Sequence, residues 1–116
     1  MKITLLGNPK SNQHIYKIAS MGGRARMYMS KEGKQLKEYY QLQAKSQWIK
    51  EPLGTDVKLA VTYYFGDKRV HDIDNFFKLT GDSLTGIVWV DDKQVIDLHL
   101  KKDYDKDNPR IELEIL

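Results

Sequence analysis

The chain has 116 residues, enough for one domain with a modest core, and its 19 basic and 16 acidic residues give a formal net charge of +3. It contains no cysteine, which excludes disulfides and thiolate metal sites and agrees with a cytoplasmic protein. No apolar run approaches the roughly 18 residues that a membrane-spanning helix needs, and the first residues are typical of a strand rather than of a signal peptide.

Charge is distributed unevenly along the chain. Residues 1–50 hold ten Lys or Arg and two Glu, whereas residues 51–116 hold nine Lys or Arg and fourteen Asp or Glu. A basic surface that binds a polyanion, next to a carboxylate-rich surface that binds metal ions, would produce this pattern. A solubilised surface with a chance bias would produce it equally well, so the asymmetry alone does not decide between the two.

The first half of the chain is predicted to contain a short strand, a long loop and one amphipathic helix. Residues 2–6 alternate as in a strand, and residues 8–26 are interrupted by Pro and Gly, which is typical of a loop. This loop mixes basic and amide side chains with aromatic ones, which suits DNA phosphate contacts and base stacking, although a solvated linker has a similar composition. Residues 31–48 then place apolar side chains at helical spacing, with Ser30 as the N-cap.

The second half is predicted to form a strand, a helix and two further strands. Residues 57–65 alternate and are rich in strand formers, and residues 73–84 carry apolar side chains at helical spacing. Residues 94–102 and 110–116 alternate again, and we expect them to pair as a hairpin. The order β-α-β-α-β-β predicts an α+β fold in which two helices pack on a sheet of about four strands, as a single domain over residues 1–116.

Four aspartates form two clusters on either side of the second predicted helix. Asp72 and Asp74 stand at its entrance, and Asp91 and Asp92 follow its exit. If the chain turns back after Gly86 the clusters meet, and a divalent cation between them is the natural way to keep converging carboxylates charged. Oxygen ligands favour Mg²⁺ or Mn²⁺ over zinc. Taken alone, Asp72 and Asp74 are explained as well by helix capping as by metal binding, and Asp91 and Asp92 are typical of a turn. Together, the two pairs favour a metal site.

Several basic side chains near these clusters are candidates for phosphate contacts. Lys78 lies four residues after Asp74, where its ammonium group would either form a surface ion pair or stabilise charge that develops on a scissile phosphate. Basic residues of the turn before Asp72 are either solvated or in contact with DNA. The candidate contacts to the DNA backbone are Lys10, Lys17, Arg24, Arg26, Lys68 and Arg69.

A second acidic stretch imitates the ligand spacing of a calcium-binding loop. It contains Asp103, Asp105 and Asp107, with Glu114 at the twelfth position. However, Asn108 stands where such a loop needs Gly, and the flanking segments are predicted strands rather than helices. We therefore interpret this stretch as an acidic turn.

Two segments resemble the motifs of the RusA family of Holliday junction resolvases, which are often prophage-encoded. They are residues 72–78, with the pattern Asp-x-Asp-Asn-x-x-Lys, and residues 89–95, with the pattern Trp-x-Asp-Asp-x-Gln-Val. A weaker similarity covers residues 9–12 and 30–33, so the resemblance extends over almost the whole chain. It implies that Asp72, Asp74 and Asp92 are catalytic, that Lys78 supports catalysis and that Asp91 is a neighbour in the site.

The resemblance also implies a function, a cofactor and a partner. We expect a Mg²⁺-dependent endodeoxyribonuclease, with Mn²⁺ as an alternative ion, that acts as a homodimer and makes paired nicks in a four-way DNA junction during recombination and repair. The expected products are a 5′-phosphate and a 3′-hydroxyl. Two other hypotheses remain open from the residues alone: a protein that binds branched DNA without cleaving it, and a nuclease for another structured nucleic acid.

Overall fold

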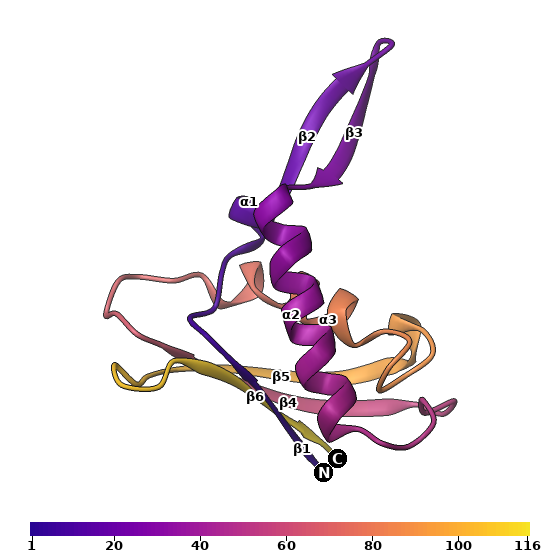
Figure 1. Ribbon diagram of the computed structural model, residues 1–116, viewed down its shortest axis with the longest axis vertical. Helices are drawn as coiled ribbons and strands as arrows, with labels where there is room; N and C mark the ends of the chain where they lie inside the picture. Colours follow the sequence, from indigo (N-terminus) through magenta and orange to yellow (C-terminus); the bar gives the residue numbers. More distant parts are fainter.

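The computed structural model describes residues 1–116, with the side chain of Met21 excepted. A four-stranded sheet carries helices on one face, and a separate two-stranded hairpin projects far from it (Figure 1). The strand order in the sheet is β1-β6-β4-β5, in which β4 is antiparallel to β6 and parallel to β5. The four strands are β1 (Lys2–Leu6), β4 (Val57–Phe65), β5 (Val95–Tyr104) and β6 (Arg110–Ile115).

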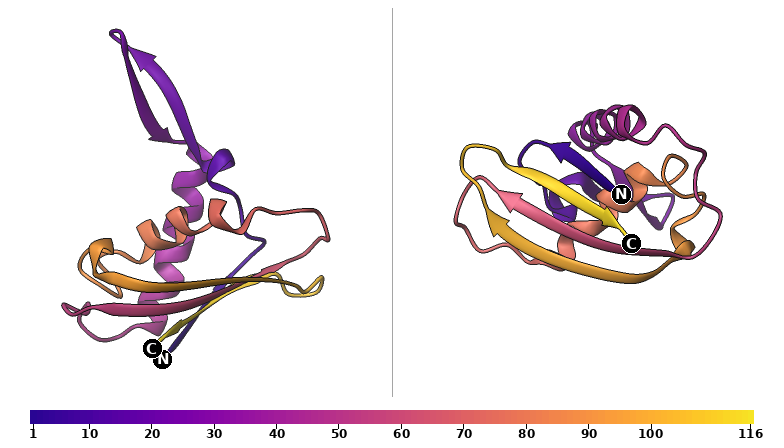
Figure 2. Two further views of the ribbon diagram at one scale, coloured as in Figure 1. Left: turned by 180° about the vertical axis from the view of Figure 1, so that it is seen from behind. Right: turned by 90° about the horizontal axis from the view of Figure 1, so that it is seen from below.

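Three helices lie on the same side of this sheet, where the prediction had two (Figure 2). They are α1 (Asn12–Ile15), α2 (Lys31–Gln47) and α3 (Phe77–Leu84). The predicted cap of α2 is confirmed, because the Ser30 hydroxyl accepts a hydrogen bond of 3.1 Å from the amide of Gly33. No helix in the described part of the chain is long and apolar enough to cross a membrane.

The alternation of residues 57–65 places every second side chain of β4 in the core, from Val57 to Phe65. These side chains pack against Tyr40 and Ala44 of α2 and against α3, so the sheet and helices form one core. Burial of such side chains contributes about 1.5–3 kcal/mol each. The α+β architecture is therefore as predicted, and the strands β1, β4 and β6 agree with the predicted ranges to within one residue.

Residues 8–26 are not the predicted loop. They contain α1 and β2 (Tyr16–Met21), which pairs with β3 (Arg24–Met29) as an antiparallel hairpin. Gly22 and Gly23 form its turn with φ angles of 59° and 79°, which only glycine adopts without strain. The strands were missed because most of their side chains are exposed, so no apolar alternation marks them.

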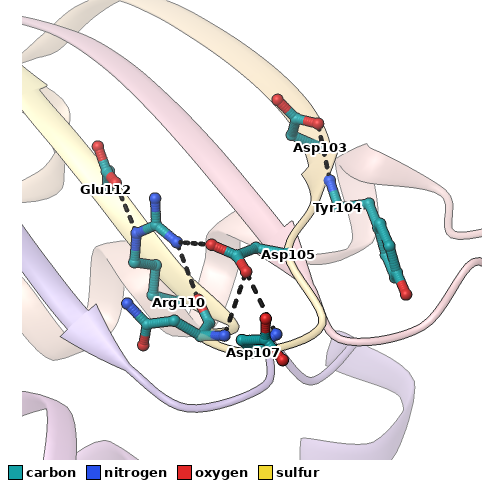
Figure 3. Close-up of polar contacts among 7 residues, drawn as sticks. Asp103, Tyr104, Asp105, Asp107, Arg110 and Glu112 are labelled. Atoms are coloured by element: carbon teal, nitrogen blue, oxygen red, sulfur yellow. Dashed lines mark hydrogen bonds and ion pairs between the residues drawn. The ribbon is translucent and has the colours of Figure 1, made fainter.

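The last two strands do not form the predicted hairpin, since β4 lies between β5 and β6. The connection passes over the end of β4, where the amide of Asp105 donates a 2.9 Å hydrogen bond to the carbonyl of Phe65. Arg110 holds this connection with hydrogen bonds of 2.7 Å to Asp105 and 2.6 Å to Glu112 (Figure 3). The hydrogen bond from Arg110 lowers the pKa of the Asp105 carboxyl. Strands flank this connection on both sides, so it is an acidic turn rather than a calcium-binding loop.

Candidate active site and DNA-binding surface

The turn that leads from β4 to Asp72 is held by an aspartate–histidine pair. The carboxylate of Asp67 accepts a 3.0 Å hydrogen bond from the amide of Arg69 and lies 3.0 Å from Nε2 of His71. The hydrogen bond from the Arg69 amide is the main cause of the lowered pKa of Asp67, and the hydrogen bond with His71 is the second cause. The His71 ring stacks on Phe65 with 4.0 Å between the ring centroids, so the last residue of β4 fixes the position of this turn.

Asp72 and Asp74 lie directly after this turn, at the short 3₁₀ helix η1 (Ile73–Asn75) that precedes α3. Both residues are exposed, and the Asp72 side chain makes no capping hydrogen bond. The N-cap position of α3 is Phe76, which also has no side-chain cap. Helix capping therefore does not explain why this sequence has two aspartates here.

Lys78 lies in the first turn of α3, but its ammonium group is directed toward the next turn of the helix. Its Nζ lies 3.3 Å from a carboxylate oxygen of Asp82 and 4.8 Å from the centroid of the Tyr16 ring. The Tyr16 hydroxyl donates a hydrogen bond to the same Asp82. Burial of the Tyr16 hydroxyl is the main cause of its raised pKa, and the hydrogen bond to Asp82 is the second cause. Lys78 thus joins α3 to the base of the hairpin, and its ion-pair partner is Asp82 rather than Asp74.

Asp91 and Asp92 lie at a second 3₁₀ helix, η2 (Asp92–Gln94), directly before β5. Asp91 caps this turn: its carboxylate accepts a 3.0 Å hydrogen bond from the amide of Lys93, and this bond is the main reason for its lowered pKa. The Gln94 amide group donates 2.7 Å hydrogen bonds to the carbonyls of Leu53 and Thr55, which fixes η2 beside the start of β4. The turn interpretation therefore holds for Asp91, whereas the exposed Asp92 is not the cap.

The two aspartate clusters do not meet within the subunit. β4 and β5 are parallel and run in register from Val57 beside Val95 to Phe65 beside Tyr104. Asp92 precedes the first of these pairs, and Asp72 follows the last, so the clusters lie toward opposite ends of two strands and of α3 (Figure 2). The predicted return of the chain after Gly86 to the Asp72 end does not occur, because Val88 and Val90 form backbone hydrogen bonds of 2.8 and 3.1 Å with Leu53, just before the start of β4.

The described residues contain no group of three or more Asp, Glu, His or Cys side chains that would hold a metal ion. A divalent cation such as Mg²⁺ takes about six oxygen ligands and generally needs more than one carboxylate. A single subunit brings only two of the four candidate aspartates to each end of β5, so the predicted ligand set does not fit a metal ion within one chain.

The candidate DNA contacts fall in two places. Lys17, Arg24 and Arg26 are exposed on the hairpin, and the register places Lys17 opposite Tyr28 and Ala19 opposite Arg26, so the basic side chains share one face with Tyr28. Lys10 and Arg69 line a cavity of about 840 Å³ between the residues before α1, the start of α2 and the turn before Asp72. Lys68 lies 5.0 Å above the ring of Tyr104, at the end of β5.

The sequence model described as "Endodeoxyribonuclease RusA" matches residues 7–116. The chain belongs to the RusA family. Over 108 residues it is 31% identical to the "Crossover junction endodeoxyribonuclease rusA" of Enterobacteria phage 82, an alignment that covers 92% of this chain and 87% of that protein. The protein is therefore a structure-specific endonuclease of the RusA family, and nucleases of this family generally use a divalent metal ion.

Two features of this RusA-family protein escaped sequence reasoning. The first is the apolar face of the hairpin, where Ile18 is 77% exposed and lies opposite Met27, which is 61% exposed. The glycine pair at the hairpin turn was a usable signal for it. The second is the pair formed by Asp67 and His71, for which the four-residue spacing is too common a pattern to be informative.

Proposed function

We propose that this protein is a Mg²⁺-dependent endodeoxyribonuclease that resolves four-way DNA junctions by paired nicks. The observation that carries this proposal is that the carboxylates of Asp72 and Asp74 are exposed and do not cap a helix. Carboxylates kept free of structural roles are what metal-assisted phosphodiester hydrolysis requires. The name of the phage 82 relative supports a crossover junction as the substrate of this chain as well.

The exposed basic side chains of the hairpin would bind DNA before cleavage. The hairpin carries Lys17, Arg24 and Arg26 on one face and is joined to α3 through Tyr16 and Lys78. Basic groups of this kind bind phosphates without regard to sequence, and each released counterion makes the affinity depend on salt. The aromatic ring of Tyr28 on the same face is suited to stacking on an unpaired base at the branch point.

We propose Mg²⁺ as the natural ion and Mn²⁺ as a functional substitute, because all four candidate ligands are carboxylates. Asp72, Asp74 and Asp92 are the proposed catalytic residues, with Asp91 as the neighbour of Asp92 and Lys78 near the phosphate. A homodimer would match the near two-fold symmetry of a four-way junction and would direct two sites to opposing strands. Junction resolution of this kind serves DNA recombination and repair.

The decisive experiment compares cleavage of a synthetic four-way junction with that of linear duplex, flap and RNA substrates, with Mg²⁺ or with a chelator. We expect paired nicks in the four-way junction in Mg²⁺ only. Equal cleavage of the linear duplex would contradict junction specificity, and preferred cleavage of the flap or RNA would assign another substrate.

The variant Asp74→Asn removes one ligand charge and nearly preserves shape. We expect it to lose cleavage and to retain junction binding in a gel-shift assay, whereas Asp107→Asn, in the acidic turn before β6, retains both. If Asp74→Asn cleaved as well as the unmodified protein, Asp74 would not be an essential ligand. Binding without any cleavage by the unmodified protein would instead favour a junction-binding protein.

A further inference from the structure

The hairpin formed by β2 and β3 carries an exposed apolar face. The strand register pairs Ile18 with Met27 and Ser20 with Ala25 on this face. Because the hairpin projects away from the sheet and the helices (Figure 1), Ile18 and Met27 remain mostly exposed. Two large apolar side chains that lie side by side on a projecting element indicate a surface that becomes buried against a partner.

The base of the hairpin is anchored, so the apolar face has a defined position relative to the core. Tyr16 and Met29, the first and last residues of the hairpin, pack against the core. The amide of Ser30 donates a 2.7 Å hydrogen bond to the carbonyl of Ile15, just below the two strands. A Cβ atom on Gly33 of α2 would lie 2.8 Å from the Met29 side chain, which is too close for a side-chain carbon. Glycine permits this contact, so the hairpin packs directly on α2.

The charges of the hairpin indicate which partner covers the apolar face. Residues 16–29 contain Lys17, Arg24 and Arg26 and no Asp or Glu. A segment whose charges are all positive is complementary to a phosphate backbone. Packing of two hairpins from two copies of this chain would bring two such cationic segments together, which is unfavourable. The charge pattern therefore favours DNA as the partner.

The part of DNA that an apolar side chain can cover is the face of a base pair, because the sugar–phosphate surface is polar and charged. In a continuous duplex every base-pair face is stacked on the next. A side chain such as Ile or Met enters only by separating two base pairs, which costs free energy. Where the arms of a branched DNA meet, stacking between arms is interrupted or more easily separated. An apolar pair therefore binds a branch point more favourably than a continuous duplex.

We propose that the hairpin is a wedge for the branch point, in which Ile18 and Met27 cover an unstacked base-pair face while Arg24 and Arg26 on the other face contact phosphates. This inference rests on the proposed function as a junction nuclease, and it adds the surface that distinguishes branched from continuous DNA. The phosphate contacts supply affinity for any DNA and depend on salt. The apolar contact supplies the preference for the junction and leaves the salt dependence unchanged.

The double variant Ile18→Ser/Met27→Ser tests the wedge through binding alone. Affinities for a four-way junction and for a linear duplex of equal length are measured by fluorescence anisotropy in Ca²⁺, and a denaturing gel checks that the strands stay intact. We expect the affinity for the junction to fall about tenfold or more, as loss of apolar burial of this size predicts, while the affinity for the duplex stays nearly constant. Equal weakening of both complexes, or of neither, would overturn the wedge.

Two control variants separate the apolar contact from other effects. Ile49→Ser changes an isoleucine that is 90% exposed after the other end of α2, and it should alter neither affinity. Arg26→Ala should weaken the junction and duplex complexes by a similar factor, because it removes a phosphate contact. The side chains of Ile18 and Met27 are exposed, so the double variant should keep the thermal unfolding midpoint of the unmodified protein.

A fluorescent base reports the unstacking directly. The fluorescence of 2-aminopurine is quenched by stacked neighbours, so this base is placed beside the branch point or, as a control, in the middle of one arm. We expect the unmodified protein in Ca²⁺ to raise the fluorescence at the branch point only. The double variant at saturating concentration should not raise it. An unchanged signal with the unmodified protein, or an equal rise with the double variant, would overturn the wedge.

Sedimentation distinguishes the wedge from a contact between subunits. We expect the double variant to have the same oligomeric state as the unmodified protein, because the apolar face contacts DNA. A change to a smaller species would assign this face to a second copy of the chain, and the wedge would be wrong. The proposed nuclease function is judged separately, from cleavage by the unmodified protein. A junction preference that survives in the double variant would remove the wedge and leave that function intact.

Discussion

The two edge strands of the sheet, β1 and β5, differ in whether another element forms hydrogen bonds with their outer backbone groups. At the β1 edge, α2 supplies glutamine side chains: Gln47 accepts from the amide of Thr4 at 2.8 Å and donates to its carbonyl at 2.7 Å, and Gln43 accepts from the amide of Leu6 at 2.8 Å. At the β5 edge, the described residues supply no such bonds from another element. One edge is therefore closed by the subunit itself, and the other is left available.

The difference follows the position of the acidic residues. No candidate ligand lies at the β1 edge, where the glutamines block addition of a further strand. Both aspartate clusters lie at the ends of β5, the edge that stays open. An edge strand with exposed apolar residues promotes aggregation. The presence of such an edge beside the candidate aspartates therefore indicates that the unpaired edge of β5 has a function.

The largest effect is expected from placing a charge on the open edge. Ile96→Lys puts a charge at an exposed apolar position of β5, the unpaired edge strand, and burial of an unpaired charge in a dimer interface there costs several kcal/mol. We expect the dimer dissociation constant to rise by about 100-fold or more in sedimentation equilibrium, with junction cleavage lost in parallel. Leu6→Lys is the matched control at the closed edge, because Leu6 is 45% exposed on β1, and it should change neither property.

If Leu6→Lys weakened the dimer while Ile96→Lys did not, the two edges would have the opposite roles. Since Ile96 is more than half exposed in the subunit, its replacement should leave the thermal unfolding midpoint of the monomer nearly unchanged. A large fall in that midpoint would mean that the variant is misfolded and that its loss of activity is indirect.

The closed edge is tested by removing a glutamine. Gln47→Ala deletes two hydrogen bonds to Thr4, each with a net contribution of about 0.5–1.5 kcal/mol, so we expect the free energy of unfolding in urea to fall by about 1–2 kcal/mol. Gln41→Ala, on the same helix, has no such bond and should cost less. Junction cleavage at low temperature should be unaffected, and a loss of cleavage in a stable Gln47→Ala dimer would contradict a purely structural role.

This contrast shows what the sequence could and could not predict. Alternation of apolar residues identified β1, β4 and β6 and the long helix α2, because each buries one face in the core. Alternation reports which face of a strand is buried but not which strand lies next to it. β5 was therefore assigned to β6, its neighbour in sequence, although it pairs with β4.

The same limitation applies to the site. The residue types and their spacing identified Asp72, Asp74, Asp91 and Asp92 as candidates, but convergence is a property of the tertiary structure. It required the chain to turn back after Gly86, whereas the apolar residues Val88 and Trp89 that follow this glycine are buried in the core. The chain turns at Gly86, but the segment that follows pairs with Leu53 before the start of β4, so the candidates stay apart within the subunit.

The hairpin lies away from both edges, and it should therefore contribute to DNA affinity without affecting the dimer. Arg26→Ala removes one phosphate contact, so we expect junction affinity to fall several-fold and the slope of log K against log salt to decrease by about 1. Met27→Ala, on the opposite face of the hairpin, should leave the salt slope unchanged. An unchanged slope in Arg26→Ala would exclude this side chain from the DNA interface.

The smallest effect concerns the turn that positions Asp72 at the end of β5. The pKa of Asp67 is lowered by the amide of Arg69 and by His71, so its ionised form stabilises the folded state. A lowered pKa contributes stability above the unfolded value of about 3.9, and this contribution is lost as the pH falls through the folded value. We expect Asp67→Asn to be slightly less stable than the unmodified protein at pH 6, and the difference in urea titrations should shrink as the pH falls below about 3.9 and disappear below the lowered pKa of the folded state. A difference that persisted unchanged at the lower pH would mean that the carboxylate charge of Asp67 is not what holds this turn against β5.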